Sequence, residues 1–135
     1  MKIEIIKCLQ DNYAYLVIDK TKSLAIVIDP SESKPIINYI EKNKLNLKFI
    51  LNTHHHFDHV GGNKELKKKY NLKVIGFKGD KNRIPEIDIA LSDKEIWRSK
   101  NLKQKFIIYL DIHQVMFAII FLNKIFYLQE ILYFH

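Results

Sequence analysis

The run Leu24–Asp29, Leu-Ala-Ile-Val-Ile-Asp, constrains the fold of this chain more than any other segment. Successive strand residues point to opposite faces of a sheet, so a strand that is apolar at every position is buried on both faces. Leu47–Leu51 has the same character, and between the two runs Ser33 is placed to cap a helix that continues to about Asn43. A strand, a helix and a second buried strand in this order predict an α/β fold.

The remaining predicted elements follow from alternation and turn residues. Turn signals at Asp11-Asn12 and at residues 20–22 separate the first strands, and Pro85 interrupts the longest polar stretch. The predicted elements are strands at Lys2–Cys8, Tyr13–Asp19 and Leu72–Phe77, a helix from about Gly62 to Tyr70, a loop at Lys78–Asp93, and a hairpin of Glu95–Arg98 with Lys105–Tyr109.

Cysteine usage and hydropathy indicate a cytoplasmic protein. Cys8 is the only cysteine among 135 residues, so no internal disulfide can form, and a reducing compartment is expected. The N-terminus alternates charged and apolar residues, unlike a signal peptide. The longest uncharged run of the tail, Gln114–Asn123, is too short to span a bilayer.

The chain carries a formal net charge of +7. Its densest basic run, Lys64–Lys69, falls on the predicted helix and contains a glutamate and a leucine. We interpret this run as a solvated helix face and predict no nucleic-acid partner, because basic residues do not cluster with aromatic ones.

The segment Thr53–Asn63, Thr-His-His-His-Phe-Asp-His-Val-Gly-Gly-Asn, is called the histidine loop here. In an extended segment His54 and His56 point the same way and His55 points elsewhere, so His55 is expected to matter little for metal binding. Asp58 and His59 lie where the loop turns into a helix, and a turn can aim them at a second point nearby. Two imidazoles in one place, and a carboxylate with an imidazole in the other, predict a two-metal site.

The histidine loop resembles the T-H-x-H-x-D-H signature of the metallo-β-lactamase superfamily. Within it the chain is most similar to the glyoxalase II (hydroxyacylglutathione hydrolase) family. Further segments that carry this resemblance are Leu9–Leu16, Ile28-Asp29-Pro30 and Arg83–Asp93, and the similarity extends from Met1 to about Tyr109.

The resemblance implies a fold, a reaction and a ligand set. The fold would be the N-terminal part of an αββα sandwich. The reaction would be hydrolysis of S-2-hydroxyacylglutathione thioesters such as S-lactoylglutathione, by water activated at two Zn²⁺ ions, with iron or manganese as alternatives. His54 and His56 would bind one metal; Asp58, the assigned catalytic residue, and His59 would bind the other. Asp29 would hold a ligand histidine in place or simply end its strand.

After Tyr109 the sequence departs from the family pattern. The family continues with T-P-G-H-T-x-G-H and then G-D-T-L-F, which supply a third histidine and an aspartate that bridges the metals, and finally a helical domain that grips glutathione. None of these follows here, although His113 falls at the count of the third histidine and stays a further candidate ligand.

A shift of reading frame accounts for this departure. Codons permitted for 110–112, 113–121 and 129–135 encode P-G-H, T-S-G-H-V-C-Y-Y-F and T-G-D-T-L-F-S when read one base earlier. We therefore predict a frameshift at about Tyr109–Leu110. Residues 1–109 would be the N-terminal portion of the domain, and residues 110–135 would be an apolar, out-of-frame, aggregation-prone tail. The alternative is a diverged tail that evolved in frame.

Three functions remain open. The first is a metal-dependent thioester hydrolase with an incomplete site. The second is an inactive truncated remnant that binds metal weakly. The third is a small protein that docks on a partner or a membrane through its apolar tail, which the charges of Asp111, Lys124 and Glu130 disfavour.

Overall fold

The computed structural model describes residues 2–20, 23–53, 55–99, 106–111, 116–121 and 124–127. The chain divides into two compact units, Met1–Ala90 and Leu91–His135. In chain order the elements are β1 (Lys2–Cys8), β2 (Asn12–Asp19), β3 (Leu24–Ile28), α1 (Ser33–Lys42), β4 (Asn46–Leu51), α2 (Phe57–Val60), α3 (Asn63–Tyr70), β5 (Lys73–Phe77), the 3-10 turn η1 (Lys78–Asp80), β6 (Ile89–Leu91), β7 (Ile96–Arg98), β8 (Phe106–Asp111), β9 (Met116–Phe121) and β10 (Lys124–Tyr127).

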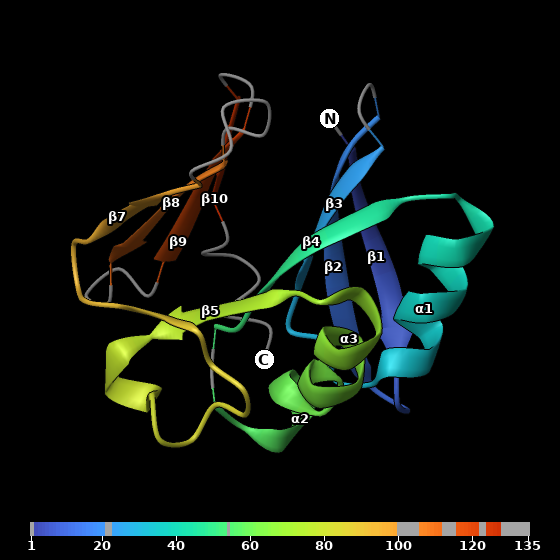
Figure 1. Ribbon diagram of the computed structural model, residues 1–135, viewed down its shortest axis with the longest axis horizontal. Helices are drawn as coiled ribbons and strands as arrows, with labels where there is room; N and C mark the ends of the chain where they lie inside the picture. Colours follow the sequence, from blue (N-terminus) through green and yellow to red (C-terminus); the bar gives the residue numbers. More distant parts are fainter. Residues whose placement is uncertain are drawn as a thin grey trace. The chain divides into compact units, whose positions relative to one another are not determined.

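The first unit is built on a sheet whose strands follow the chain, in the order β1-β2-β3-β4-β5-β6 (Figure 1). β1, β2 and β3 pair antiparallel, whereas β4 pairs parallel with both β3 and β5. A parallel neighbour requires a crossover, and the helices provide it: α1 joins β3 to β4, and α2 with α3 joins β4 to β5. This confirms the predicted α/β class.

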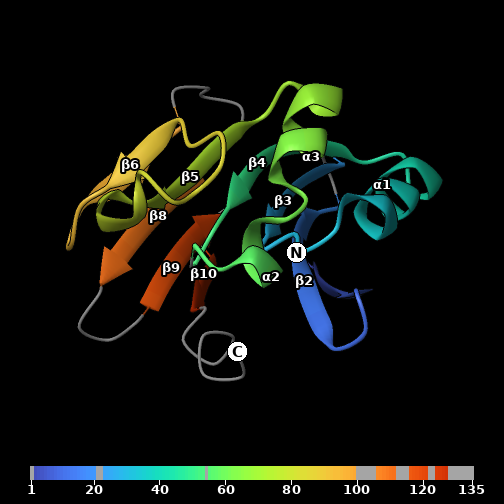
Figure 2. The same cartoon turned by 90° about the horizontal axis from the view of Figure 1, so that it is seen from below.

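Helices α1 and α3 cover one face of this sheet (Figures 1 and 2). Ile36 and Ile40 of α1 and Leu66 of α3 are fully or almost fully buried there, in one apolar cluster with alternate residues of the strands. The other parity of the strands is buried as well: Ile26 and Ile28 are inaccessible to solvent. The prediction that Leu24–Asp29 is buried on both faces of the sheet is confirmed.

The second unit holds an antiparallel sheet of order β10-β9-β8-β7. The predicted hairpin is confirmed, because Ile96 pairs with Tyr109 and Arg98 with Ile107. The expected domain boundary at residues 109/110 falls inside β8, whose Leu110 pairs with Phe117. The frameshift itself concerns the gene and stays a prediction.

Three expected local features differ in the structure. Glu32, not Ser33, occupies the N-cap of α1 and makes no side-chain cap bond; the Ser33 hydroxyl donates to Glu65 Oε2 at 2.6 Å. The segment expected to be a loop at Lys78–Asp93 contains η1 and β6. The histidine loop contains a helical turn of its own, α2.

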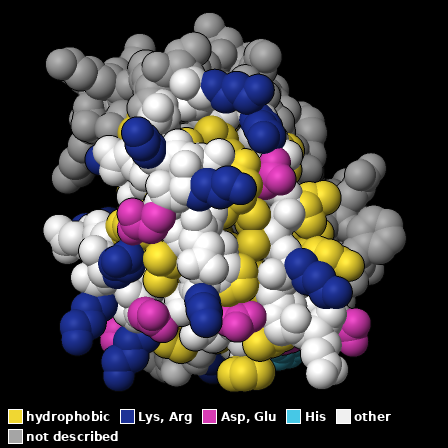
Figure 3. Space-filling view, turned by 90° about the vertical axis from the view of Figure 1, so that its right-hand side faces the viewer, with side chains coloured by type: hydrophobic (Ala, Val, Ile, Leu, Met, Phe, Trp, Pro, Cys, Tyr) yellow, Lys and Arg dark blue, Asp and Glu magenta, His cyan; other side chains and the backbone are white. Residues whose placement is uncertain are grey.

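One face of the molecule carries side chains of both charges. On the face shown in Figure 3, lysine and arginine side chains are interspersed with aspartate and glutamate. Pairs such as Lys2–Glu4 at 3.1 Å contribute to this mixture. None of the helices among the described residues is long and apolar enough to cross a membrane.

Candidate metal centre

The candidate site lies where β3 and β4 end. These strands are parallel and in register, with Ile28 opposite Leu51, so the residues that follow each strand meet at one edge of the sheet. The amide of Asp29 donates to the carbonyl of Leu51 at 3.0 Å and extends this pairing by one step. The register therefore brings Asp29 beside the start of the histidine loop, although 24 residues separate Asp29 from Thr53.

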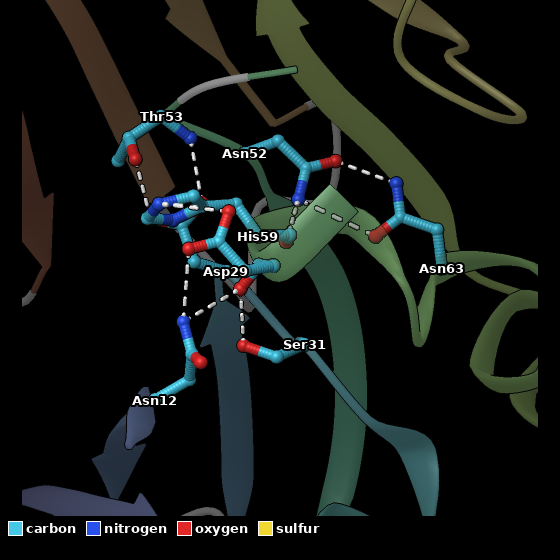
Figure 4. A network of polar contacts seen from close by, with 8 residues as sticks. Asn12, Asp29, Ser31, Asn52, Thr53, His59 and Asn63 are labelled. Carbon is cyan, nitrogen blue, oxygen red and sulfur yellow. Dashed lines mark hydrogen bonds and ion pairs between the residues drawn. The ribbon is translucent and has the colours of Figure 1, made fainter. Parts of the chain in front are cut away.

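Asp29 is the hub of the site and is inaccessible to solvent. Its Oδ1 accepts a hydrogen bond from the Thr53 amide at 2.7 Å, and its Oδ2 accepts one from the Thr53 hydroxyl. The same Oδ2 lies 3.1 Å from Nδ1 of His59, an ion-pair contact. Asp29 has a φ of 52°, a left-handed conformation that aspartate tolerates better than most residues. One carboxylate thus fixes both ends of the ligand segment (Figure 4).

Asp58 is held from the opposite side by residues of β2 and of the β3–α1 connection. The side-chain amide of Asn12 donates to Asp58 Oδ2 at 3.0 Å, and the Ser31 hydroxyl donates to the Asp58 carbonyl. Asn12 reaches this position because β2 runs antiparallel to β3, so its first residue lies at the edge where β3 ends. The sequence favoured a plain turn at Asn12, but the structure brings this residue to the site.

Charge in the site is balanced between His59 and Asp58. Burial lowers the pKa of His59, but the contact with Asp29 and the charges of Asp29 and Asp58 outweigh burial and raise this pKa above its ordinary value. Partial burial raises the pKa of Asp58, and the Asn12 hydrogen bond with the charges of His59 and His56 outweighs it, so this pKa is lowered. The site therefore favours an ionised Asp58.

Asp58 Oδ1 and His59 Nε2 face each other. Asp58 Oδ1 lies 3.7 Å from His59 Nε2, while the other side of each group is occupied by Asn12 and Asp29 respectively. Two ligand atoms on one tetrahedral zinc ion are about 3.4 Å apart. An imidazole nitrogen and a carboxylate oxygen at this spacing suit zinc in both chemistry and distance.

The other histidines of the loop occupy different surroundings. The ring centroid of His56, an exposed residue, lies 6.5 Å from that of His59. His55 points to another part of the chain, as expected, where its Nδ1 lies 3.1 Å from Asp80 Oδ1. His54 and the further candidate His113 lie outside the described residues. Within the part of the chain that is described, no group of three or more ligand-type side chains is close enough to hold a metal ion.

A buried pair of amides fastens the histidine loop to the scaffold, and no sequence pattern singled out this pair. Asn52 donates to the carbonyl of His59 at 3.1 Å and exchanges hydrogen bonds with Asn63, which also donates to the carbonyl of Pro85 at 3.2 Å. Both asparagines are inaccessible to solvent. The pair closes the loop at its two ends, since Asn52 precedes it and Asn63 ends it.

Gly61 and Gly62 allow the loop to approach the β3–α1 connection. A Cβ on Gly61 would lie 2.3 Å from the Ser31 carbonyl oxygen, and one on Gly62 would lie 2.8 Å from that of Pro30. The Gly62 amide donates to the same Pro30 carbonyl at 2.7 Å. These two glycines therefore make room for neighbouring backbone.

Comparisons with known proteins identify the family of this chain. The family model described as "Metallo-beta-lactamase superfamily" matches residues 10–95. Similar relatives include a hydroxyacylglutathione hydrolase of Pelagibacter ubique, 64% identical over 105 residues, which cover 78% of this chain and 44% of the relative. One of Methylococcus capsulatus is 42% identical over 98 residues, covering 73% and 38%. A cytoplasmic one of Arabidopsis thaliana is 46% identical over 82 residues, covering 60% and 32%. The chain thus spans less than half the length of these curated relatives.

Solved structures with a similar fold include two members of the same fold family. The crystal structure of the BLEG-1 B3 metallo-beta-lactamase has a TM-score of 0.70 at 16% identity, covering 89% of this chain and 67% of its own. That of ETHE1 from Myxococcus xanthus has a TM-score of 0.61 at 20% identity, covering 82% and 53%. At such low identity, this structural similarity shows the fold alone. The matched family model shows that this chain belongs to the metallo-beta-lactamase superfamily.

Proposed function

We propose that this chain is, by ancestry, a metal-dependent hydrolase of the glyoxalase II type, acting on S-2-hydroxyacylglutathione thioesters such as S-lactoylglutathione. The observation that carries the proposal is the facing pair Asp58 Oδ1 and His59 Nε2, 3.7 Å apart and each fixed from behind. The relatives named hydroxyacylglutathione hydrolase, 64% identical in the first case, supply the substrate class.

We propose separate roles for these residues in metal binding. His59 and Asp58 hold one ion, while Asp29 and Asn12 orient them. His56 and His54 are proposed for the other ion, and His54 lies outside the described residues. When bound, zinc supplies Lewis-acid chemistry and makes water nucleophilic at neutral pH.

We further propose that the protein is cytoplasmic and that zinc is its resident metal. We also propose that the hydrolytic activity of the 135-residue chain is low. The segment 110–135 contains neither of the two family motifs that supply the remaining ligands. Loss of substrate positioning alone can raise a barrier by ~7 kcal/mol. An inactive remnant that still binds metal is therefore the second candidate.

A comparison of two proteins tests this proposal. One is the 135-residue chain; the other restores the reading frame at codon 110 and continues translation. With Zn²⁺ supplied, we expect hydrolysis of S-lactoylglutathione by the repaired protein and little or none by the original. Strong turnover by the original would contradict the impaired site, and inactivity of the repaired protein would contradict the frameshift.

A further inference from the structure

His55 is fixed on both edges of its ring by residues that the proposed reaction does not use. Its Nδ1 lies 3.1 Å from Asp80 Oδ1, and its Nε2 lies 3.5 Å from Nη1 of Arg83. A guanidinium group can only donate, so Nε2 is the acceptor and Nδ1–H is the donor. The ring is therefore oriented by a carboxylate on one side and a guanidinium on the other.

The segment that holds His55 is itself anchored in the core. The amides of Arg83 and Ile84 donate to the Asp80 carbonyl at 2.9 and 3.0 Å, which closes a tight turn after η1. Ile84 is 4% exposed and belongs to the core cluster beneath the helices. Asp80 and Arg83 thus project from a turn whose position is set by packing, and they can serve as fixed points.

The ring of His55 also contacts the ring of its neighbour, His56. The rings of His55 and His56 pack edge to face, with centroids 4.7 Å apart. His56 is exposed, so burial does not fix its side chain. An edge-to-face aromatic contact stabilises the arrangement in which it forms, so the contact with His55 favours this orientation of His56.

We propose that His55 is a positioning residue, which orients His56 for metal binding through its contacts with Asp80 and Arg83. The proposal rests on the proposed function, in which His56 is a ligand. It also replaces the expectation that His55 matters little. Groups that orient a ligand from behind commonly change metal affinity by about 10- to 100-fold.

Zinc affinity of the full chain provides the first test, measured by competition with a chromophoric chelator. We expect His55→Ala to weaken Zn²⁺ binding by about 10-fold and Asp80→Asn to weaken it in the same direction, as is typical of groups behind a ligand. Glu86→Gln is the matched control, because Glu86 lies in the same connection but pairs with Lys67 at 3.9 Å. Zinc affinity of His55→Ala within twofold of the parent overturns the proposal.

The ring resonances of the metal-free chain provide a second test that does not depend on zinc. We expect His55→Ala and Asp80→Asn each to shift the ring signals of His56 in ¹H–¹⁵N spectra, and Glu86→Gln to leave them in place. Unchanged His56 signals in both variants overturn the positioning role. If the parent binds no zinc but the shifts are present, the proposed function fails while the positioning role stands.

Discussion

Replacing Asp29 by alanine should destabilise the fold more than any other single change at the site. The carboxylate accepts from the Thr53 amide and hydroxyl and contacts His59 Nδ1, all in a position without solvent access. Loss of a hydrogen bond or ion pair to a buried carboxylate costs about 1–3 kcal/mol, and Thr53 and His59 would each lose such a contact. Alanine also costs about 1 kcal/mol more than aspartate in the left-handed conformation. We expect Asp29→Ala to lower the free energy of unfolding by about 3–5 kcal/mol.

Two further variants separate the causes of this loss. Asp29→Asn keeps a residue that tolerates a φ of 52° and one acceptor oxygen for the Thr53 amide, so we expect a smaller loss of about 1–2 kcal/mol. Asp29→Gly removes the side chain as alanine does but tolerates positive φ, so its loss should be about 1 kcal/mol smaller than that of alanine.

Urea unfolding of the full metal-free chain at pH 7, followed by far-UV circular dichroism, measures these differences. The expected order of stability is parent, then asparagine, then glycine, then alanine. A loss of less than about 1 kcal/mol for Asp29→Ala would refute the reasoning, since surface substitutions commonly stay within about 0.5 kcal/mol. Equal losses for asparagine and alanine would show that acceptor geometry at Asp29 does not matter.

Two other predictions concern the loop and the effect of acid. Gly61→Ala should lower the free energy of unfolding by about 2 kcal/mol, because the added Cβ would lie 2.3 Å from the Ser31 carbonyl oxygen. Gly79→Ala is the control and should cost less, because the atoms nearest to its Cβ belong to the movable ring of Phe77. Equal losses of urea stability in the two variants would contradict this. Burial raises the pKa of Asp88, but the hydrogen bonds from Lys67 and the Val74 amide outweigh burial and lower this pKa. The ionised Asp88 therefore stabilises the fold above pH 3.8, and this stabilisation is lost as the pH falls through the lowered pKa. Between pH 5 and pH 3 the parent should therefore lose about 1 kcal/mol more than Asp88→Asn, and parallel curves of urea stability would contradict this.

Strands β1 to β5 of the first unit were predictable because they carry clear apolar patterns, whereas β6 lies in the segment expected to be a loop. Leu24–Ile28 is apolar throughout, and the structure buries every residue of this strand, β3. The ends of elements were less predictable because they depend on distant partners. The sequence predicts Ser33 as an N-cap, yet its hydroxyl donates a hydrogen bond to Glu65, 32 positions further along the chain.

The same distinction applies to the site. The ligand types of the histidine loop, and the role considered for Asp29, followed from the residues and the family resemblance. Asn12 could not be placed, because its contact with Asp58 spans 46 residues and depends on β2 starting where β3 ends. Asn52 and Asn63 are ordinary residues in sequence, and only burial shows that their amides pair.

His55 shows how far a spacing argument reaches. Alternation along an extended segment predicts that His55 points elsewhere than His54 and His56, but it gives no information about what His55 contacts. Asp80 is 25 residues further along, and it reaches His55 because β5 lies beside β4, so that the turn after β5 follows the same edge as the histidine loop. The register of parallel strands thus places Asp29, the histidine loop and η1 at one edge of the sheet. A histidine that lies outside the ligand pattern can therefore still determine how a neighbouring ligand is held.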